Sequence, residues 1–132
     1  MRFQGLSWRE MGLPVIRLTI RSASLAAERA ETMLSLARGL MFRRHLAPDA
    51  GLLLCFPRSG NHGIHMWFVR IPLDVLFLSE NGVVARIHCA QPGAFPFRPG
   101  TSIRYVLETN LGWCDRHGII VGDRCQGLPA PR

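Results

Sequence analysis

The sequence predicts an α+β fold that is rich in β-strands, with a mostly antiparallel sheet and two short helices. Two observations support this prediction. Short apolar or alternating runs, typical of strands, recur along the 132-residue chain and are separated by turns rich in Gly, Pro and Asn. Helical patterns are confined to residues 24–43 and 111–117. The pattern gives about six strands and two helices, a set that is also compatible with a barrel-like closure of the sheet.

The first half of the chain contains one alternating strand, one helical stretch and one apolar strand. Residues 14–20 alternate apolar and polar side chains, which predicts a half-buried strand. Residues 24–43 are rich in helix formers, with Gly39 as the residue that ends the helix and Thr32 as an N-cap where a helix can begin again. Residues 52–56 are uniformly apolar and predict a buried strand.

The most informative local signal is the dipeptide Asn81-Gly82, which separates two β-runs and predicts a two-residue hairpin turn of type I′. The register of the hairpin follows from this loop, because residues directly opposite each other share a face of the sheet. On this register Asp74 lies on the drier face, at the end of a row of apolar side chains, and Val84 lies on the other face. The predicted pairs are Glu80–Val83, Leu78–Ala85, Leu76–Ile87 and Asp74–Cys89.

The second half of the chain predicts a long loop, a strand, a short helix and a last strand. Residues 89–102 contain three prolines, which excludes a central strand and predicts a loop. Residues 103–109 alternate as a strand does, and Asn110 is a good N-cap for the helix at 111–117. Residues 119–123 predict the last strand and its turn.

One globular domain is expected over residues 14–126, with a flexible arm at 1–13 and a flexible tail at 127–132. No run of about eighteen apolar residues occurs, so we expect no membrane span. The N-terminus lacks the apolar segment of a signal peptide, which makes a cytoplasmic location the default. The four cysteines show no C-x-x-C spacing. We therefore expect reduced thiols, with Cys125 the most exposed, and neither a metal site nor a cofactor.

The net charge of +7, carried by sixteen arginines and no lysine, raises the question of an acidic partner. Arginine suits phosphate and carboxylate groups, so polyanion binding is one function to consider. The arginines are scattered, however, and Arg43-Arg44 is the only adjacent pair. A basic charge without a clustered patch is weak evidence, so we do not expect tight binding to nucleic acid. The sequence does not indicate an oligomeric state.

Four segments carry a combination of motifs in a consistent order: RGLM at 38–41, IHMWFVRIPLD at 64–74, YVLETNLG at 105–112 and VGD at 121–123. This combination resembles the uncharacterised bacterial and archaeal family called domain of unknown function 192, over residues 24–125. The resemblance implies a compact β-rich fold with short helices, no established activity, and relatives that are often exported or lipid-anchored. It also implies a strand at 24–30, so a strand followed by a short helix and one long helix both remain open there.

Asp74, with its neighbours Arg70 and His65, is the best candidate site. A charge at the rim of the core needs hydrogen bonds or an arginine. We expect backbone amides freed by the bend at Pro72 to surround this carboxylate, together with Arg70 or Arg38. The segment 64–74 resembles one branch of the family, in which a glycine stands where this chain has Phe68, and a ring there would narrow a cleft.

Two classes of function fit these candidates. The first is a small ligand-binding or accessory module with a polar cleft near Asp74, which takes a small molecule. Its ligand-binding residues would be His65, Arg70, Asp74, Glu108 and Asn110. The second is an uncharacterised hydrolase-like enzyme in which Asp74 and Glu108 act as an acid–base pair. A structural role for Asp74, and a helix-capping role for Asn110, are equally open, so the sequence does not decide whether the chain is an enzyme.

Overall fold

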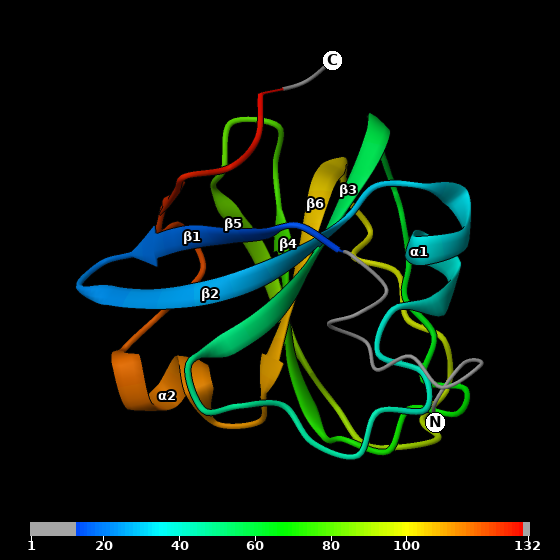
Figure 1. Cartoon of the computed structure of the whole chain (residues 1–132). Coiled ribbons are helices and arrows are strands. Elements are labelled where there is room, and N and C mark those ends of the chain that lie inside the picture. The colour runs from blue at the N-terminus through cyan, green and yellow to red at the C-terminus, as the bar shows by residue number, and fades with distance from the viewer. Residues whose placement is uncertain (1–12, 131–132) are drawn as a thin grey trace.

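The computed structural model describes residues 13–130, which form one curved seven-stranded sheet and two short helices (Figure 1). The elements are β1 (Val15–Ile20), β2 (Ala23–Ala30), α1 (Met33–Arg38), β3 (Ala50–Gly60), β4 (Leu73–Leu78), β5 (Val84–Ala90), β6 (Ile103–Asn110), α2 (Trp113–His117) and β7 (Cys125–Gln126). The strand order across the sheet is β5-β4-β6-β3-β2-β1-β7. A bridge between Val83 and Arg124 joins the segments beside the two edge strands, so the sheet curls into a half-barrel. The predicted β-rich α+β fold is confirmed.

The sheet is antiparallel except at one place, because β2 and β3 run parallel. A parallel pair needs a long crossover connection. Residues 31–49 form this crossover and carry α1, which lies beside β3 (Figure 1). Within residues 13–130, no helix is long and apolar enough to cross a bilayer.

The segment 24–43 forms a strand and then a short helix, which decides between the two open alternatives. The side chains of β2 alternate between buried and more exposed positions, with Leu25 fully buried. Thr32 is the predicted N-cap of α1, and its hydroxyl accepts a hydrogen bond from the backbone N–H of Ser35 at 3.1 Å. The helix ends at Gly39, whose φ of 50° lies in the left-handed region that favours glycine. The helix propensity of residues 24–30 therefore yields to burial between two strands.

The β4–β5 hairpin keeps the predicted register around the Asp74–Cys89 pair and departs from it at the turn. The loop contains three residues rather than two. The N–H of Ser79 donates to Val83 O at 2.9 Å, and the N–H of Gly82 donates to Ser79 O at 2.9 Å. Gly82 has a φ of 81°. A tight turn closed by a left-handed glycine thus replaces the predicted type I′ turn.

Two hydrophobic cores lie on the two faces of the sheet. In the inner core, side chains from both edges of the sheet meet, among them Val84 and Cys125, and α2 contributes the fully buried Trp113. Val84 was predicted on the other face, and a bulge in β5 shifts it into this core. The outer core lies between the opposite face and the segments 40–46 and 64–71. Both faces of β4 are buried, so the prediction of a single drier face is wrong for this strand.

Three predictions about the second half of the chain are wrong. Asn110 does not cap α2, because the N-cap is Gly112, two residues later. Residues 119–123 form a turn rather than a strand, and the last strand is β7. Cys125 is buried in the inner core, whereas Cys89 is the exposed cysteine. All four cysteines are free thiols, and the predicted end of α2 at a glycine is confirmed.

The two ends of the predicted domain differ in what the structure describes. The arm predicted at 1–13 lies outside the described residues, apart from Leu13. The segment predicted as a tail is packed as far as residue 130. Leu128 contacts the inner core, and the hydroxyl of Tyr105 donates to Pro129 O at 2.7 Å.

Candidate functional site

Asp74 is a buried carboxylate at the start of β4 that binds the first turn of α2. The residue is 3% exposed. Its Oδ2 accepts the backbone N–H groups of Gly112 at 3.1 Å and Cys114 at 3.0 Å, and its Oδ1 accepts the Cys89 thiol at 3.4 Å. Backbone N–H groups in the first turn of a helix have no partner within the helix. Asp74 therefore supplies, from a neighbouring strand, the cap that α2 lacks in its own sequence.

The structure confirms amide partners for Asp74 but corrects their origin. They belong to α2 rather than to the bend at Pro72, whose carbonyl accepts the N–H of Leu111 instead. Among the described residues, no arginine is bonded to the Asp74 carboxylate. Arg70 is exposed, so the expected Asp74–Arg70 pair does not form. The surroundings of Asp74 are those of a structural cap.

Asn110 also holds chain segments together. Its Nδ2 donates to Leu46 O at 2.8 Å and to Ala47 O at 3.2 Å. These carbonyls lie in the crossover just before β3. Asn110 thus ties the end of β6 to the chain that leads into the neighbouring strand, donating to Leu46 O and adding a second donor to Ala47 O, which also accepts the N–H of Ala50.

Glu108 is a buried carboxyl group whose Oε1 has no hydrogen-bond partner among residues 13–130. It is 4% exposed and lies on β6 between its strand partners Leu52 of β3 and Val75 of β4. Burial raises the pKa of Glu108 to about 7, and the positive charge of Arg43 offsets part of this rise. Arg43 itself forms an ion pair with Glu28. The Glu108 carboxyl therefore gains or loses its proton near neutral pH. Its Oε1 has no hydrogen-bond donor among residues 13–130.

The register of β4 and β6 keeps Asp74 and Glu108 apart. Asp74 pairs with Thr109, so these two side chains share the inner face of the sheet. Glu108 precedes Thr109 on the same strand and must project from the outer face. The outer core around Glu108 includes its partners Leu52 and Val75. The two carboxylates do not converge, so the acid–base pair predicted for a hydrolase is not assembled.

A cavity of about 230 Å³ lies beside Glu108 on the outer face. Its polar side chains are Glu108, His65 and Arg38. Gly39 brings the backbone close to the carboxyl group, since a Cβ at this position would lie 3.6 Å from Glu108 Oε1. The rest of the wall is apolar, with Leu36, Leu40, Leu54, Phe56, Ile64 and Val69. The crossover forms one side of this cavity, and β3 with the 63–69 loop forms the other.

His65 joins the 63–69 loop to α1 through one ring nitrogen and braces the loop itself through the other. Its Nε2 lies 3.0 Å from Ala37 O, and its Nδ1 accepts the backbone N–H of Trp67 at 3.1 Å. The tautomer with hydrogen on Nε2 satisfies both contacts. The ring also packs against the Trp67 side chain, with 5.0 Å between the ring centroids. His65 therefore holds the wall of the cavity in place.

The structure brings together two of the five predicted ligand-binding residues. Glu108 and His65 line the same cavity, whereas Arg70 lines neither this cavity nor the second one described below. Sequence analysis missed Arg38 and Gly39 as lining residues, although both belong to the RGLM motif at 38–41. Within residues 13–130, no group of three or more His, Cys, Asp or Glu side chains is arranged to hold a metal ion.

Comparisons with known sequences match most of the chain. The family model DUF192, described as Uncharacterized ACR, COG1430, matches residues 16–127. A UPF0127 protein from Thermococcus sibiricus is 32% identical over 98 residues, which cover 71% of this chain and 60% of that protein. The match thus spans less than two thirds of that relative. A UPF0127 protein from Pyrococcus furiosus is 31% identical over 90 residues, 67% of this chain and 74% of that protein.

Solved structures show the same fold. A crystal structure from Sinorhizobium meliloti, of a protein provisionally described as a transcription regulator, gives a TM-score of 0.84 at 30% identity and covers 88% of this chain and 95% of that chain. A crystal structure of a protein of unknown function from Novosphingobium aromaticivorans gives 0.80 at 28% identity, covering 87% of this chain and 86% of that chain. With the family model matching residues 16–127, the chain belongs to the DUF192 family.

Proposed function

We propose that this protein is a small ligand-binding module, and that the cavity beside Glu108 takes a small molecule. Glu108 and His65 are the contact residues in this proposal, since both line the cavity. Asp74 and Asn110 act indirectly, because they hold α2 and the chain before β3 in place around the sheet. Arg70 has no part in this site. The descriptions of the family and of its structural neighbours name no established activity.

The observation that supports this proposal is the buried Oε1 of Glu108, which has no hydrogen-bond partner among the described residues. A buried polar atom without a partner costs about 1–3 kcal/mol. Most such atoms in native proteins have a partner, so each exception calls for an explanation. Perturbed carboxyl groups are also concentrated at functional sites. A ligand with an N–H or O–H group would remove the cost by donating to Glu108.

The size and lining of the cavity limit the chemistry of this ligand. Ligand pockets usually measure about 300–1,000 Å³, so a cavity of about 230 Å³ suits a small molecule. The apolar wall favours a compact apolar body, and Glu108 favours one hydroxyl, amide or amine group on it. Because burial raises the pKa of Glu108 to about 7, the carboxyl can also donate a hydrogen bond when it is protonated.

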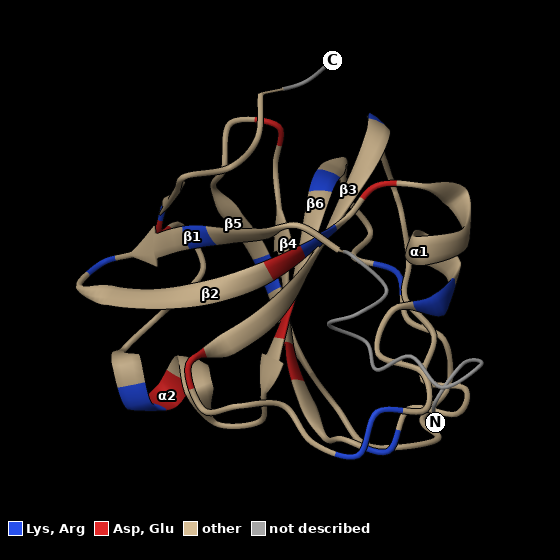
Figure 2. Cartoon of the chain, in the orientation of Figure 1, with Lys and Arg blue, Asp and Glu red and all other residues tan. Residues whose placement is uncertain are grey.

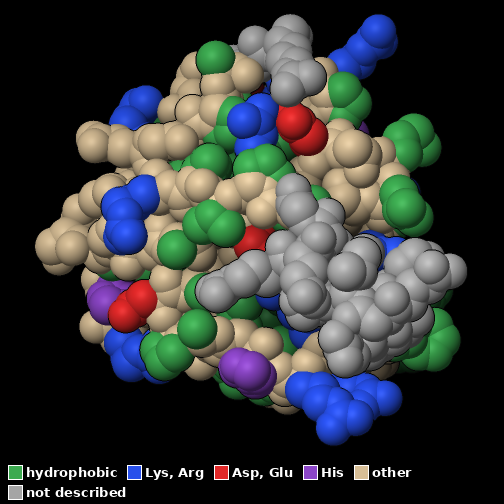
Figure 3. All heavy atoms as spheres, viewed as in Figure 1, with side chains coloured by type: hydrophobic (Ala, Val, Ile, Leu, Met, Phe, Trp, Pro, Cys, Tyr) green, Lys and Arg blue, Asp and Glu red, His purple; other side chains and the backbone are tan. Residues whose placement is uncertain are grey.

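The other two functions find less support in the geometry. The hydrolase-like enzyme needs Asp74 and Glu108 on one face, and the register of β4 and β6 sets them on opposite faces. Polyanion binding needs a continuous basic surface. Figure 2 shows the basic residues spread over β1, β6, α1 and α2 and the loops at the bottom of the view, and Figure 3 shows them as separate spots with one larger group at the lower edge. A small-molecule module therefore agrees best with the observations.

A thermal-shift screen of the purified protein against sugars, nucleotides, small alcohols and small amines tests the proposal. A specific ligand at one hundred times its Kd stabilises the folded state by about 2.7 kcal/mol. Each stabilising compound is then retested with Glu108→Gln and with Asp115→Asn. Asp115 is an exposed carboxylate on α2, away from the cavity, and serves as the matched control.

The expected result is that a hit stabilises the wild-type protein and Asp115→Asn equally, and Glu108→Gln much less. NMR chemical-shift changes for the same compound should centre on Gly39, His65 and Glu108. A compound that stabilises Glu108→Gln as well as the wild type, with shifts elsewhere, would contradict this site.

A further inference from the structure

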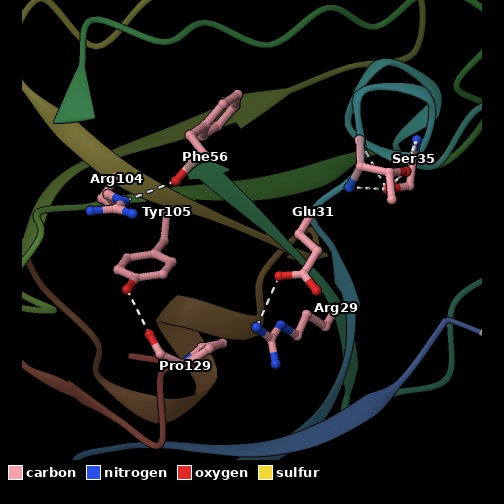
Figure 4. A network of polar contacts seen from close by, with 8 residues as sticks. Arg29, Glu31, Ser35, Phe56, Arg104, Tyr105 and Pro129 are labelled. Carbon is pink, nitrogen blue, oxygen red and sulfur yellow. Dashed lines mark hydrogen bonds and ion pairs between the residues drawn. The ribbon is translucent and has the colours of Figure 1, made fainter. Parts of the chain in front are cut away.

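A second cavity, of about 270 Å³, lies at the end of the half-barrel where β2 ends and β6 begins. Cys55 of β3 and Tyr105 of β6 lie side by side as strand partners and belong to the inner core. Pro129 and the residue after it line the cavity from the C-terminal segment. Figure 4 shows Tyr105 and Pro129 from these walls, together with Arg29 and Arg104. Mouths of β-barrels are common places for ligands.

Two arginine side chains line this cavity. Arg104 is 7% exposed, and its Nε donates to Phe56 O at 2.8 Å while Nη1 donates to Glu80 Oε1 at 2.9 Å. Arg29 donates from Nη2 to Glu31 Oε2 at 2.9 Å. A guanidinium group has five N–H donors. Most N–H donors of the two guanidinium groups therefore take no part in these bonds. The same bonds hold both guanidinium groups in fixed positions.

The Nε atom of Arg29 is buried and has no hydrogen-bond partner among residues 13–130. Like Glu108 Oε1, it is a buried polar atom without a partner. It is a donor and needs an acceptor, whereas Glu108 Oε1 needs a donor. A buried donor without an acceptor destabilises the fold. An acceptor placed in the cavity would remove this cost.

The charges around the cavity leave its deeper part positive. The two carboxylates that pair with the arginines are nearer to solvent: the Glu80 side chain is 55% exposed and that of Glu31 is 32% exposed, against 9% for Arg104 and 22% for Arg29. Solvent screens an exposed charge more strongly than a buried one. Glu31 also lines the cavity, and its charge, with that of the more exposed Glu80, only partly compensates the more buried guanidinium groups.

Cys55 and Tyr105 do not add a negative charge that would balance the two guanidinium groups. Burial raises the pKa of the Cys55 thiol to about 11, although both guanidinium groups act to lower it. Burial also raises the pKa of Tyr105, again against both arginines. Both groups are therefore protonated near neutral pH. Both arginines also line this one cavity.

We propose that this second cavity binds a small oxyanion, a carboxylate or phosphate group, between Arg29 and Arg104. Guanidinium forks match the paired oxygens of such groups, and the charge-assisted bonds are stronger than neutral ones. The site differs from the proposed Glu108 site in its lining, because among the described residues Phe56 alone lines both cavities.

The direct test is an NMR titration of the arginine Nε–H signals of the wild-type protein, with inorganic phosphate in one arm and acetate in the other. Sodium chloride keeps the ionic strength constant and provides the baseline. The Arg29 Nε–H signal, identified by its loss in Arg29→Lys, should shift in a saturable manner with phosphate, acetate or both. The arm that saturates identifies the oxyanion class. Chloride alone should leave the signal in place.

Variants show whether the binding depends on the cavity. Arg29→Met keeps an apolar stem and removes the fork, so it should weaken anion binding about tenfold to a hundredfold, followed at the Arg104 signal. Arg17→Met is the control, since Arg17 is an exposed strand arginine outside the cavity that bonds to Ser24, and it should leave the affinity unchanged. A wild-type Arg29 signal that neither anion shifts in a saturable manner overturns the proposal. Equal anion affinity in Arg29→Met and in the wild type also overturns the proposal. If Arg29→Met does not fold, the wild-type titration decides alone.

Discussion

Replacing Asp74 with alanine removes the only acceptor that the structure gives to the N–H groups of Gly112 and Cys114 at the start of α2. A buried donor left unsatisfied costs about 1–3 kcal/mol. Cys114 is buried, so its amide bears this cost in full, whereas Gly112 is half-buried and regains part of its bonding from water. We therefore expect Asp74→Ala to lower the free energy of unfolding by about 2–4 kcal/mol.

Thermal unfolding followed by circular dichroism measures this loss. For a chain of this length, 1 kcal/mol corresponds to a shift in Tm of about 4 °C, so Asp74→Ala should melt about 8–16 °C below the wild type. Asp115→Ala is the control, because it removes an exposed carboxylate from the same helix. Asp74→Asn keeps an oxygen acceptor and should fall between the two.

The capping role of Asp74 has a clear contrary outcome. If Asp74→Ala melts within about 2 °C of Asp115→Ala, two amide bonds to a buried carboxylate contribute less than the lower limit for one unsatisfied donor. In that case α2 does not depend on Asp74. Loss of ligand binding with an unchanged Tm would instead place Asp74 in a binding site.

Three further predictions concern pH, the crossover and nucleic acid. Because burial raises the pKa of Glu108 from 4.5 to about 7, the folded state holds this proton more tightly, and stability should fall by about 3 kcal/mol as pH rises through this window. Urea denaturation should show this fall in the wild type and not in Glu108→Gln. Asn110→Ala should lower the free energy of unfolding by about 1–2 kcal/mol, since Leu46 O loses its donor and Ala47 O loses one of two donors, and an unchanged urea midpoint would refute this. An electrophoretic titration with duplex DNA should show no tight complex at physiological salt, and a steeply salt-dependent complex would overturn that expectation.

Local signals in the sequence were sufficient for several parts of the fold. The cap at Thr32 and the stop at Gly39 act within one turn of chain, so both ends of α1 could be predicted. The Asp74–Cys89 pair follows from the predicted two-residue loop, and it is observed because the bulge in β5 offsets the additional residue of the actual loop. These features depend on neighbours in the sequence or on a single turn.

Features set by distant segments were not predictable in this way. Residues 23–30 have the composition of a helix, and they form a strand because β1 and β3 pair with them on both sides. The hairpin turn depends on the C-terminal segment, since Val84 N–H donates to Asp123 O at 2.8 Å and its own carbonyl accepts the N–H of Gly122 at 2.8 Å. These bonds keep Val84 at the inner core and produce the bulge.

The candidate site shows the same division between local and distant causes. The need of Asp74 for hydrogen-bond donors followed from its place in an apolar run, but the identity of the donors depended on α2 returning to β4. The alternation of β6 left Glu108 on a face whose cover was unknown. Only the crossover, which brings Gly39 beside Glu108, turns that face into a cavity.

The shortness of α1 has a consequence for the kinetics of the proposed Glu108 site. The helix has six residues, none of them fully buried, and helices this short are unstable without tertiary support. Segments with few buried contacts open locally at a free energy well below that of global unfolding. The amide protons of α1 should therefore exchange with solvent much faster than those of β4 and β6, whose side chains are almost all buried. Local opening of the crossover would then widen the cavity beside Glu108, which is already partly open to solvent, while the sheet stays intact.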